Sequence, residues 1–290
     1  MEKSICYYHA DMDGICSAGI IKKIFPDVTL RAVQYGDDYE QIISETLGFN
    51  GCFIVDFSFP EDIMHKLHSM YGRNFCWIDH HKSAMEKLQD LWNDGSIDGL
   101  RKMDKSGCEL TWHWFFPHEE APMIIQYVGD YDTWTFRLND TKAVGEYLPI
   151  IVQKPEDIIE YFDNKRVNWQ FISAGELLIK AKERRIAQSF AEGEECDMWV
   201  NPASTGYQKN CFVCNSNVDI SNLGNYIANE GYDIGIVWSI RKGKLIVNLR
   251  SIGDIDVSQL AKNWGGGGHK NASGFNLPSV YDLKKVLKVR

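Results

Sequence analysis

The first half of the chain alternates short apolar runs with segments of helical periodicity. Buried β-strands are predicted where the runs are mainly apolar, at Ile5–Tyr8, Val28–Val33, Cys52–Val55 and Phe75–Ile78. Helices are predicted between and after them, at Gly14–Phe25, Tyr39–Leu47, Pro60–Tyr71 and Ser83–Leu91. Pro60 and Ser83 are residue types favoured where a helix begins. The alternation predicts βαβ units and a mostly parallel sheet, which is the α/β class.

Helices predominate after this predicted sheet, first one separate helix and then a mainly helical stretch from Met123 to about Phe190. Ser106-Gly107 precedes the separate helix, predicted at Cys108–Phe116. The segment Ile172–Phe190 combines apolar residues at helical spacing with a charged face, and an acidic run follows it. This pattern predicts a connecting helix and then a domain boundary. An ordinary surface helix of the first domain is an equally good interpretation.

The C-terminal part of the chain begins again with strands. They are predicted at Cys211–Cys214, Ile234–Ile240 and Leu245–Leu249, with helices at Leu223–Glu230 and Val257–Trp264. The tetrapeptide Arg241-Lys242-Gly243-Lys244 predicts a hairpin turn. We therefore expect a catalytic domain over residues 1–171, a connecting helix and linker over 172–195, and a smaller α/β domain over 196–290.

Length and composition agree with two globular domains. The 290 residues are too many for one typical core, and 44% hydrophobic with 24% charged residues is typical of globular proteins. No apolar run reaches the length of a transmembrane helix, and no signal-peptide pattern precedes the first strand. We expect a cytoplasmic protein without a membrane partner. Its eight cysteines lie mostly in apolar segments, which predicts buried, reduced thiols. Cys211 and Cys214 fit a strand with its thiols on opposite faces or in a core better than a zinc site.

Charge is distributed unevenly between the two predicted domains. The net charge of −9 argues against a protein that coats nucleic acid. From Asp197 onward, however, 11 basic residues face 7 acidic ones, whereas the preceding residues carry 20 against 33. An acidic half that holds cations beside a basic half that holds an anion suits a phosphate-containing substrate.

Acidic and imidazole side chains follow three of the predicted strands. These residues are His9, Asp11, Asp13, Asp56, Asp79, His80 and His81. Because ligands bind at the carboxyl ends of strands in open α/β sheets, we expect the side chains to meet at one edge. Alternate residues of an extended segment point the same way, which would bring His9, Asp11 and Asp13 together. Oxygen and imidazole groups at this density suit Mn²⁺, Mg²⁺ or Zn²⁺ and favour a metal-dependent enzyme.

Structural interpretations compete at several of these positions. Asp and Gly are ordinary turn formers, so the His9–Gly14 segment alone is also compatible with a simple turn. Asp56 could cap the helix that follows, although Ser58 is available for that role. A fourth acidic segment contains Asp130 and Asp132, and either carboxylate could reach the site while the other caps a turn.

Four consecutive glycines, Gly265–Gly268, precede His269 and Lys270. Such a run is too permissive for the interior of a strand or helix, and it lets backbone N–H groups approach an anion closely. A helix N-terminus after the run would add a favourable dipole. Arg250 ends the predicted strand Leu245–Leu249 and could add a bidentate phosphate contact. A flexible linker and a surface salt bridge are the respective structural alternatives.

Together these motifs resemble the DHH phosphoesterase superfamily, in its DHH–DHHA1 branch. That family includes RecJ-type exonucleases, bacterial nano-RNases (oligoribonuclease-like phosphodiesterases) and phosphatases of adenosine bisphosphate. The resemblance covers nearly the whole chain. Its motifs are His9–Gly14, Asp56, Asp79-His80-His81 and most plausibly Asp130, followed by the DHHA1 signature Val247–Ser251 with Gly265–Gly274.

The resemblance implies two divalent metal ions, preferably Mn²⁺ with Mg²⁺ as the alternative. His9 and Asp11 would hold one ion, Asp13, His80 and Asp130 the other, and Asp56 would bridge them. Asp79 and His81 would be catalytic, with His81 contacting the scissile phosphate or polarising the leaving group. The residues that would bind the substrate's terminal phosphate are Arg250, Ser251, Gly266, Gly267, Gly268 and His269.

Two departures from the family pattern weaken parts of this assignment. In many relatives the first histidine precedes the DxD pair by two more residues than His9 does, and the fourth motif leaves Asp130 against Asp132 unsettled. The chain also lacks the extra domains of RecJ exonucleases, which disfavours processive degradation of long single strands.

We therefore expect a two-metal phosphodiesterase or exonuclease that hydrolyses short single-stranded oligonucleotides (nanoRNA, dinucleotides) to mononucleotides in a cleft between the domains. One alternative is a phosphomonoesterase acting on adenosine bisphosphate or a cyclic-nucleotide phosphodiesterase. An alternative of another class is a catalytically silent nucleotide-binding module. The sequence leaves RNA against DNA, substrate length, polarity of attack and oligomeric state open, a homodimer included.

Overall fold

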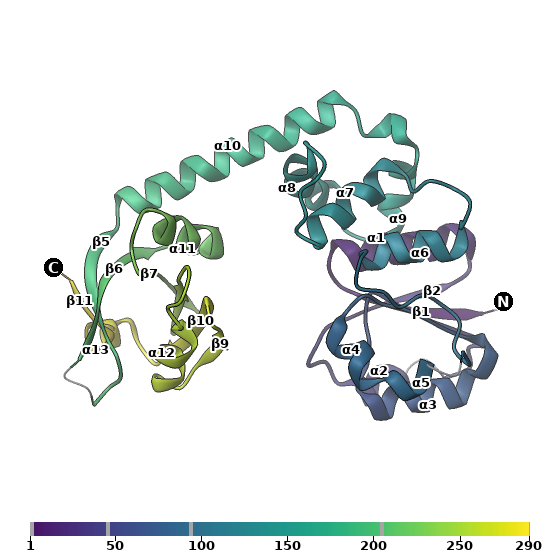
Figure 1. The fold of residues 1–290 in the computed structure, drawn as a ribbon, viewed down its shortest axis with the longest axis horizontal. Coiled ribbons are helices and arrows are strands. Elements are labelled where there is room, and N and C mark those ends of the chain that lie inside the picture. The colour runs from purple at the N-terminus through teal and green to yellow at the C-terminus, as the bar shows by residue number, and fades with distance from the viewer. Residues whose placement is uncertain (1–2, 45–46, 93–94, 204–205, 290) are drawn as a thin grey trace. The chain divides into compact units, whose positions relative to one another are not determined.

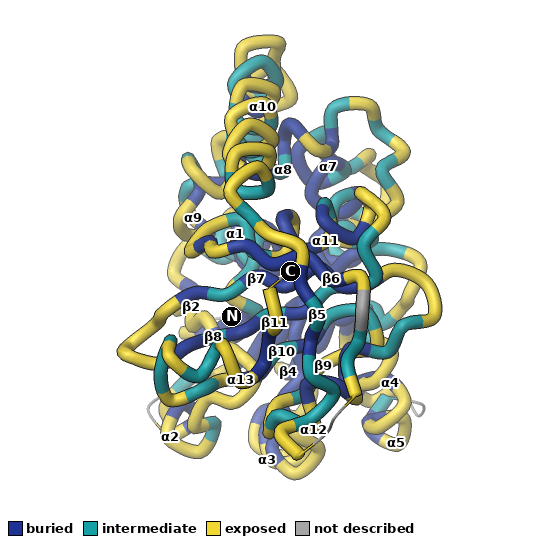
Figure 2. The backbone as a smooth tube through the Cα atoms, turned by 90° about the vertical axis from the view of Figure 1, so that its left-hand side faces the viewer, coloured by how far each residue is buried: buried dark blue, intermediate teal, exposed yellow. Residues whose placement is uncertain are grey.

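The structure is a computed structural model that describes residues 3–44, 47–92, 95–203 and 206–289. The chain divides into two compact units, Met1–Ile179 and Lys180–Arg290. The long helix α10 (Trp169–Ala191) contains the division between them and contributes residues to both (Figure 1). Much of α10 is exposed or only partly buried, as Figure 2 shows. It covers the segment predicted as a connecting helix.

The first unit is built on a parallel sheet of four strands in the order β2-β1-β3-β4. The strands are β1 (Ser4–His9), β2 (Thr29–Val33), β3 (Gly51–Val55) and β4 (Phe75–Ile78). Every residue of β3 and β4 is buried, which explains their continuously apolar sequences. The predicted α/β class and all four predicted strands are confirmed.

Helices cover both faces of this sheet (Figure 1). On one face lie α1 (Met12–Ile24) and α6 (Gly107–Phe115). On the other lie α2 (Tyr39–Ser44), α3 (Glu61–Tyr71), α4 (Lys82–Lys87) and α5 (Gln89–Trp92). The single helix predicted at Ser83–Leu91 is in fact α4 and α5, and His81 rather than Ser83 is the N-cap. The two helices separate at Leu88, which is buried in the core. The end of the predicted helix Tyr39–Leu47 includes residues 45–46, which lie outside the described residues.

A helical layer adjoins α1 and α6. It consists of α7 (Met123–Asp132), α8 (Thr141–Ile151), α9 (Pro155–Ile158) and the first part of α10. Short 3₁₀ helices occur at Gly72–Asn74, Ile159–Phe162 and Asn164–Arg166. Helix α6 begins with a capping box in which Ser106 and Glu109 satisfy each other's backbone amides. The Ser106-Gly107 signal in the sequence therefore marks a true helix start.

The second unit contains a sheet of seven strands in the order β11-β5-β6-β7-β8-β10-β9. They are β5 (Glu194–Trp199), β6 (Tyr207–Asn215), β7 (Ile234–Arg241), β8 (Lys244–Arg250), β9 (Gly267–His269), β10 (Ala272–Leu277) and β11 (Leu287–Val289). Within the described residues, β6 and β7 pair in parallel and the other neighbouring strands pair antiparallel. The helices are α11 (Ile220–Asn229), α12 (Val257–Asn263), α13 (Leu283–Val286) and a 3₁₀ turn at Val280–Asp282.

Local sequence signals account for two details of this sheet. Lys242 and Gly243 both have positive φ angles, of 50° and 77°, as a two-residue hairpin turn between β7 and β8 requires. Cys211 and Cys214 belong to two different core clusters, on opposite faces of β6, and both are buried. No cysteine appears in any candidate metal-binding group among the described residues.

The glycine run differs from its prediction. Gly267–His269 forms strand β9, which pairs antiparallel with β10. Helix α12 precedes the glycines, and the next element after β9 is the strand β10. The expected helix N-terminus after the glycines is therefore wrong. Gly268 has a φ of 137°, and a Cβ at Gly266 would lie 2.1 Å from the carbonyl oxygen of Gly274. Glycine is needed at both positions because this strand is tightly apposed to its partner.

Candidate metal centre

The predicted acidic cluster assembles at the carboxyl ends of β1, β3 and β4. Candidate ligand atoms lie within 4.8 Å of one another in three overlapping groups. These groups are His9, Asp11 and Asp56, then Asp13, His80 and Asp132, and finally Asp56, His80 and His81. In the described parts of the chain, every predicted ligand except Asp130 belongs to one of them.

The first group combines a turn with the end of a buried strand. Asp11 caps α1, because its Oδ1 accepts a hydrogen bond from Gly14 N at 2.9 Å, and its Oδ2 lies 2.6 Å from His9 Nδ1. His9 Nδ1 lies 4.0 Å from Asp56 Oδ2. A Cβ at Gly14 would lie only 2.0 Å from the His9 carbonyl oxygen, so glycine permits this close entry into the helix. The short spacing between His9 and Asp11 thus still brings the two side chains together.

Asp56 occupies the centre of the cluster. Its φ of 53° is left-handed, which turns the chain sharply at the end of β3. A Cβ at Gly107 would lie 2.6 Å from the Asp56 Cβ, so this glycine lets α6 begin directly against the carboxylate. His80 Nε2 lies 3.2 Å from Asp56 Oδ1. Asp56 is therefore in reach of His9 and His80, and sequence reasoning overlooked the part played by Gly107.

The second group contains a carboxylate from α7. His80 Nε2 lies 3.5 Å from Asp132 Oδ2 and 3.8 Å from Asp13 Oδ2. Asp13 is buried and receives hydrogen bonds from two backbone amides at the start of α6, Gly107 N at 2.6 Å and Cys108 N at 2.9 Å. Helix α1 starts at Met12, so Asp13 lies in its first turn and not in an extended segment as predicted. The helix nevertheless directs Asp13 to the same edge as Asp11.

Asp79 contacts the backbone amides of His80 and His81 and the imidazole ring of His81. Its Oδ1 accepts hydrogen bonds from His80 N at 2.8 Å and His81 N at 3.2 Å, and it lies 2.7 Å from His81 Nδ1. The Asp79 hydrogen bond raises the pKa of His81, against the opposing effect of burial. Asp79 is fully buried and appears in none of the candidate ligand groups among the described residues. The geometry therefore makes Asp79 a positioning residue for His81.

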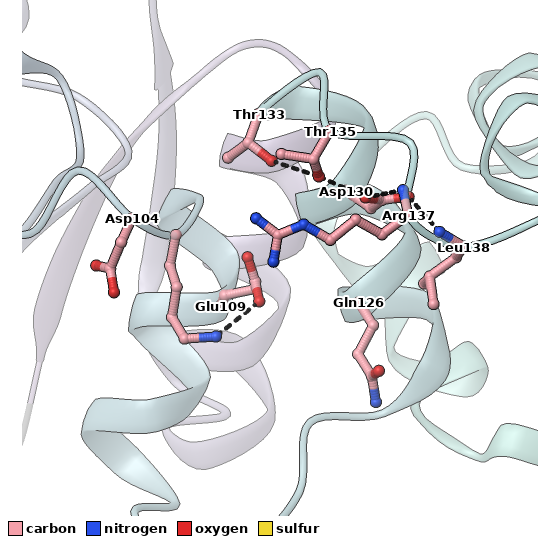
Figure 3. Close-up of a pocket in the computed structure, with 9 residues that line it drawn as sticks. Asp104, Glu109, Gln126, Asp130, Thr133, Thr135, Arg137 and Leu138 are labelled. Carbon is pink, nitrogen blue, oxygen red and sulfur yellow. Dashed lines mark hydrogen bonds and ion pairs between the residues drawn. The ribbon is translucent and has the colours of Figure 1, made fainter.

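Asp130 does not reach the cluster. Its carboxylate accepts hydrogen bonds from Thr135 Oγ1 at 2.5 Å, Arg137 N at 2.8 Å and Leu138 N at 3.1 Å, and a further one from Thr141 Oγ1. Figure 3 shows this carboxylate beside the loop that carries Thr135 and Arg137, at a polar pocket lined also by Glu109 and Gln126. Burial opposes ionisation, but the donors lower the pKa of Asp130 to about 2. The expectation that Asp130 joins the ligand group is corrected: Asp132 lies beside His80 instead.

The electrostatics of the cluster fit a cation. Burial, followed by the charges of Asp13 and Asp11, raises the pKa of Asp56 well above its usual value, and the same causes raise the pKa of Asp132 to about 7. Within the described residues, the buried Asp56 Oδ1 has no hydrogen-bond partner, although His80 lies close to it. Carboxylates that repel one another and retain a free lone pair are the donors that hard divalent ions prefer.

This repulsion predicts how metal-free protein responds to pH. Because the pKa of Asp132 is raised in the folded state, the folded protein binds more protons than the unfolded one, and stability is lost as pH rises from about 4 through about 7. The raised pKa of His81 acts in the same direction. The thermal midpoint of chelator-treated wild type should fall over this pH range. The fall should be smaller when Mn²⁺ is added back, and smaller in the Asp132→Asn variant. A flat profile in metal-free wild type would contradict the assigned cluster.

In the second unit, register brings the predicted phosphate-binding residues to the end of three neighbouring strands. Arg250 of β8 pairs with Ala272 of β10, which pairs with His269 of β9. Directly paired residues share a sheet face, so Arg250 and His269 project to the same side. Arg250 donates to Ser221 Oγ at 2.8 Å, and burial lowers the pKa of its guanidinium. Gly266, Gly268 and His269 are exposed, and Gly267 is partly buried.

Ser251 has a structural role that the sequence did not indicate. Its hydroxyl donates to the Ile255 carbonyl at 2.8 Å and accepts from Asn271 Nδ2 at 3.1 Å, and the residue is buried. These bonds join the loop after β8 to the turn between β9 and β10. Ser251 thus supports the loop beside Arg250, and its side chain is already occupied.

Comparison with known proteins finds a family match for the C-terminal part of the chain and relatives that cover most of its length. Residues 214–289 match the family model described as the DHHA1 domain. Over 314 aligned positions the chain is 26% identical to oligoribonuclease NrnB of Bacillus subtilis, covering 96% of this chain and 74% of that protein. An uncharacterized protein of Acanthamoeba polyphaga mimivirus is 29% identical over 78% of this chain, which spans 52% of that relative.

A solved structure shares the fold. The pGpG-specific phosphodiesterase PggH from Vibrio cholerae aligns over 98% of this chain and 96% of its own, with a TM-score of 0.55 and 11% identity. The parallel sheet with its acidic edge, the second mixed sheet and the matched DHHA1 region agree with these similarities. These similarities support a DHH–DHHA1 phosphoesterase, and therefore a hydrolase.

Proposed function

We propose that the protein is a metal-dependent phosphodiesterase that hydrolyses short oligonucleotides to mononucleotides with two divalent cations, preferably Mn²⁺. The observation that carries this proposal is a pair of adjacent ligand groups, one containing Asp56 and the other His80. The two groups meet where His80 Nε2 lies 3.2 Å from Asp56 Oδ1. Two adjacent three-residue groups are what a two-metal site requires, whereas one cation would need only one of them.

The residues divide naturally between two cations. His9 and Asp11 would hold one, Asp13, His80 and Asp132 the other, and Asp56 would serve both. Asp13 would keep its orientation through the two α6 amides, which act as outer partners of a ligand. When bound, the cations would stabilise the charge that develops on the phosphate during hydrolysis.

His81 would act on the substrate directly. With Nδ1 engaged by Asp79, its Nε2 is the ring atom left to face the substrate, and the raised pKa increases its protonated fraction near neutral pH. A protonated imidazole can donate a proton to the departing oxygen of the scissile bond. Asp79 would position this ring and maintain its charge.

The substrate class rests on the second unit and on the relatives. Arg250 and His269 offer cationic and donor groups suited to a phosphate, next to backbone that only glycine can form. NrnB is an oligoribonuclease and PggH a pGpG-specific phosphodiesterase by name, which supports a short oligonucleotide as the substrate here. No helix in the described parts of the chain is long and apolar enough to span a membrane. A cytoplasmic location stays a prediction.

The test is a product analysis with labelled substrates. Purified protein is incubated with RNA and DNA oligomers of two to about ten nucleotides, adenosine 3′,5′-bisphosphate and cyclic AMP, each with Mn²⁺, Mg²⁺ or chelator. We expect mononucleotides from the dinucleotide, only with a metal present. Preferred release of phosphate from the bisphosphate or opening of cyclic AMP would replace the proposed substrate. Tight nucleotide binding without turnover would show a silent binding module.

A further inference from the structure

Tyr35 is an exposed aromatic residue at the edge of the metal centre. The residue is 55% exposed, yet its ring centroid lies 5.5 Å from that of His9 and 6.4 Å from that of His81. Its other ring neighbour is the buried Phe57, 4.8 Å away. One face of the phenol is thus supported by the protein while much of the side chain remains accessible.

The loop that carries Tyr35 is held in one conformation. Tyr39 OH accepts a hydrogen bond from Gly36 N at 2.9 Å and donates to the Gln34 carbonyl at 3.2 Å. Gln34 N donates to Asp37 Oδ2 at 2.8 Å, and Gln34 Nε2 donates to the Ala10 carbonyl at 3.3 Å. Gly36 supplies the left-handed turn with a φ of 96°. These bonds fasten Tyr35 to the loop that follows β1, so its ring is pre-organised beside the ligands.

A cavity lies beside Tyr35. It has a volume of about 550 Å³ and is bounded by Tyr35, Tyr39, Phe59 and Leu88, with Ser83 and Lys87 among its polar walls. A dry cavity of about 150 Å³ is enough to bind benzene, so this one has room for a nucleobase with its sugar. Aromatic walls with a few hydroxyl and charged groups are typical of sites that bind flat heterocycles.

We propose that Tyr35 stacks on a nucleobase of the substrate and that the cavity beside it receives that nucleoside. This inference rests on the proposed function, because it places the base next to a phosphate held at the metal centre. Base–aromatic stacking tolerates any base, which suits an enzyme that must process oligonucleotides of mixed sequence. The alternative is a purely structural role, in which Tyr35 only covers His9 and Phe57.

The experiment compares substrates with and without a base. Wild type, Tyr35→Ala and Tyr35→Phe are assayed on a dinucleotide and on its analogue with an abasic residue. In Tyr35→Ala we expect KM for the dinucleotide to rise about tenfold, while KM for the abasic analogue stays unchanged. In Tyr35→Phe we expect KM values near those of wild type for both substrates. Trp169→Ala is the matched control, because Trp169 is a 72% exposed aromatic residue of the same unit with no place in the site.

Direct binding separates failure of this inference from failure of the proposed function. Calorimetry with Mn²⁺ present measures adenosine 5′-monophosphate against ribose 5-phosphate on wild type and Tyr35→Ala. Tighter binding of the nucleotide that disappears in Tyr35→Ala supports stacking even if no substrate is hydrolysed. An equal loss of affinity for the ligands with and without a base, or no change in affinity for either, would overturn the inference. Hydrolysis of the dinucleotide in that case would leave the proposed function standing.

Discussion

Replacing Asp56 by asparagine is expected to lower metal-dependent hydrolysis of a dinucleotide by about 10³-fold, while the thermal midpoint of metal-free protein stays at or above that of wild type. Activity falls because the substitution removes a carboxylate that lies within reach of both ligand groups. Stability is preserved because the amide has the same shape and removes a charge that its four neighbouring carboxylates disfavour. Asparagine also tolerates the left-handed backbone at this position.

Two measurements check this result. Initial rates are taken with saturating Mn²⁺, and thermal midpoints are recorded with and without Mn²⁺ on chelator-treated protein. Wild type should be stabilised by the metal through ligand linkage, and Asp56→Asn should not. Asp27→Asn, which changes an exposed aspartate, is the matched control. An Asp56→Asn protein that retains both its rate and its metal-dependent stabilisation would remove Asp56 from the metal centre.

The pair Asp132→Asn and Asp130→Asn should separate activity from stability. We expect Asp132→Asn to reduce hydrolysis by about 10²-fold with little loss of stability, because this side chain faces His80 and is partly exposed. Asp130→Asn should instead cost about 2 kcal/mol of the free energy of unfolding, because an amide cannot accept all four hydrogen bonds that the carboxylate receives.

Urea titrations and rates measured well below the unfolding midpoint distinguish the two variants. Activity per folded molecule should persist in Asp130→Asn, since its carboxylate lies outside the ligand groups of the described residues. The reverse pattern, with activity lost in Asp130→Asn and kept in Asp132→Asn, would restore the assignment expected from the sequence. Equal rate losses in both variants would indicate that the last turn of α7 contributes to activity as a whole and not through one carboxylate.

Strand ends carried most of the predictable information about the site. A buried apolar run followed by a charged residue indicates a site residue, and both the candidate ligand Asp56 and the positioning residue Asp79 follow such runs. The choice between Asp130 and Asp132 was beyond the sequence, because both lie in the last turn of α7. Residues two apart on a helix point in nearly opposite directions, so only one of them can face β4. The groups that donate hydrogen bonds to Asp130 belong to residues 135–141, and their positions are set by tertiary structure.

The second unit was harder to predict for a related reason. Strands β5, β9, β10 and β11 were not anticipated, since they are short, polar or glycine-rich and acquire their pairing from distant segments. Glycine-rich β9 forms because β10 supplies its hydrogen bonds, which no local preference reveals. The row of Arg250 and His269 likewise depends on the register of three strands.

The hydrogen bonds between Asp13 and the start of α6 have a consequence for biosynthesis. Gly107 lies 94 residues beyond Asp13, yet its amide holds one carboxylate oxygen and its missing side chain makes room for Asp56. At typical elongation rates the ribosome needs about 5 to 20 s to traverse that interval. A nascent chain that exposes only the first acidic motif therefore lacks the amides that orient Asp13, and the candidate metal centre cannot be completed before the start of α6 has been made.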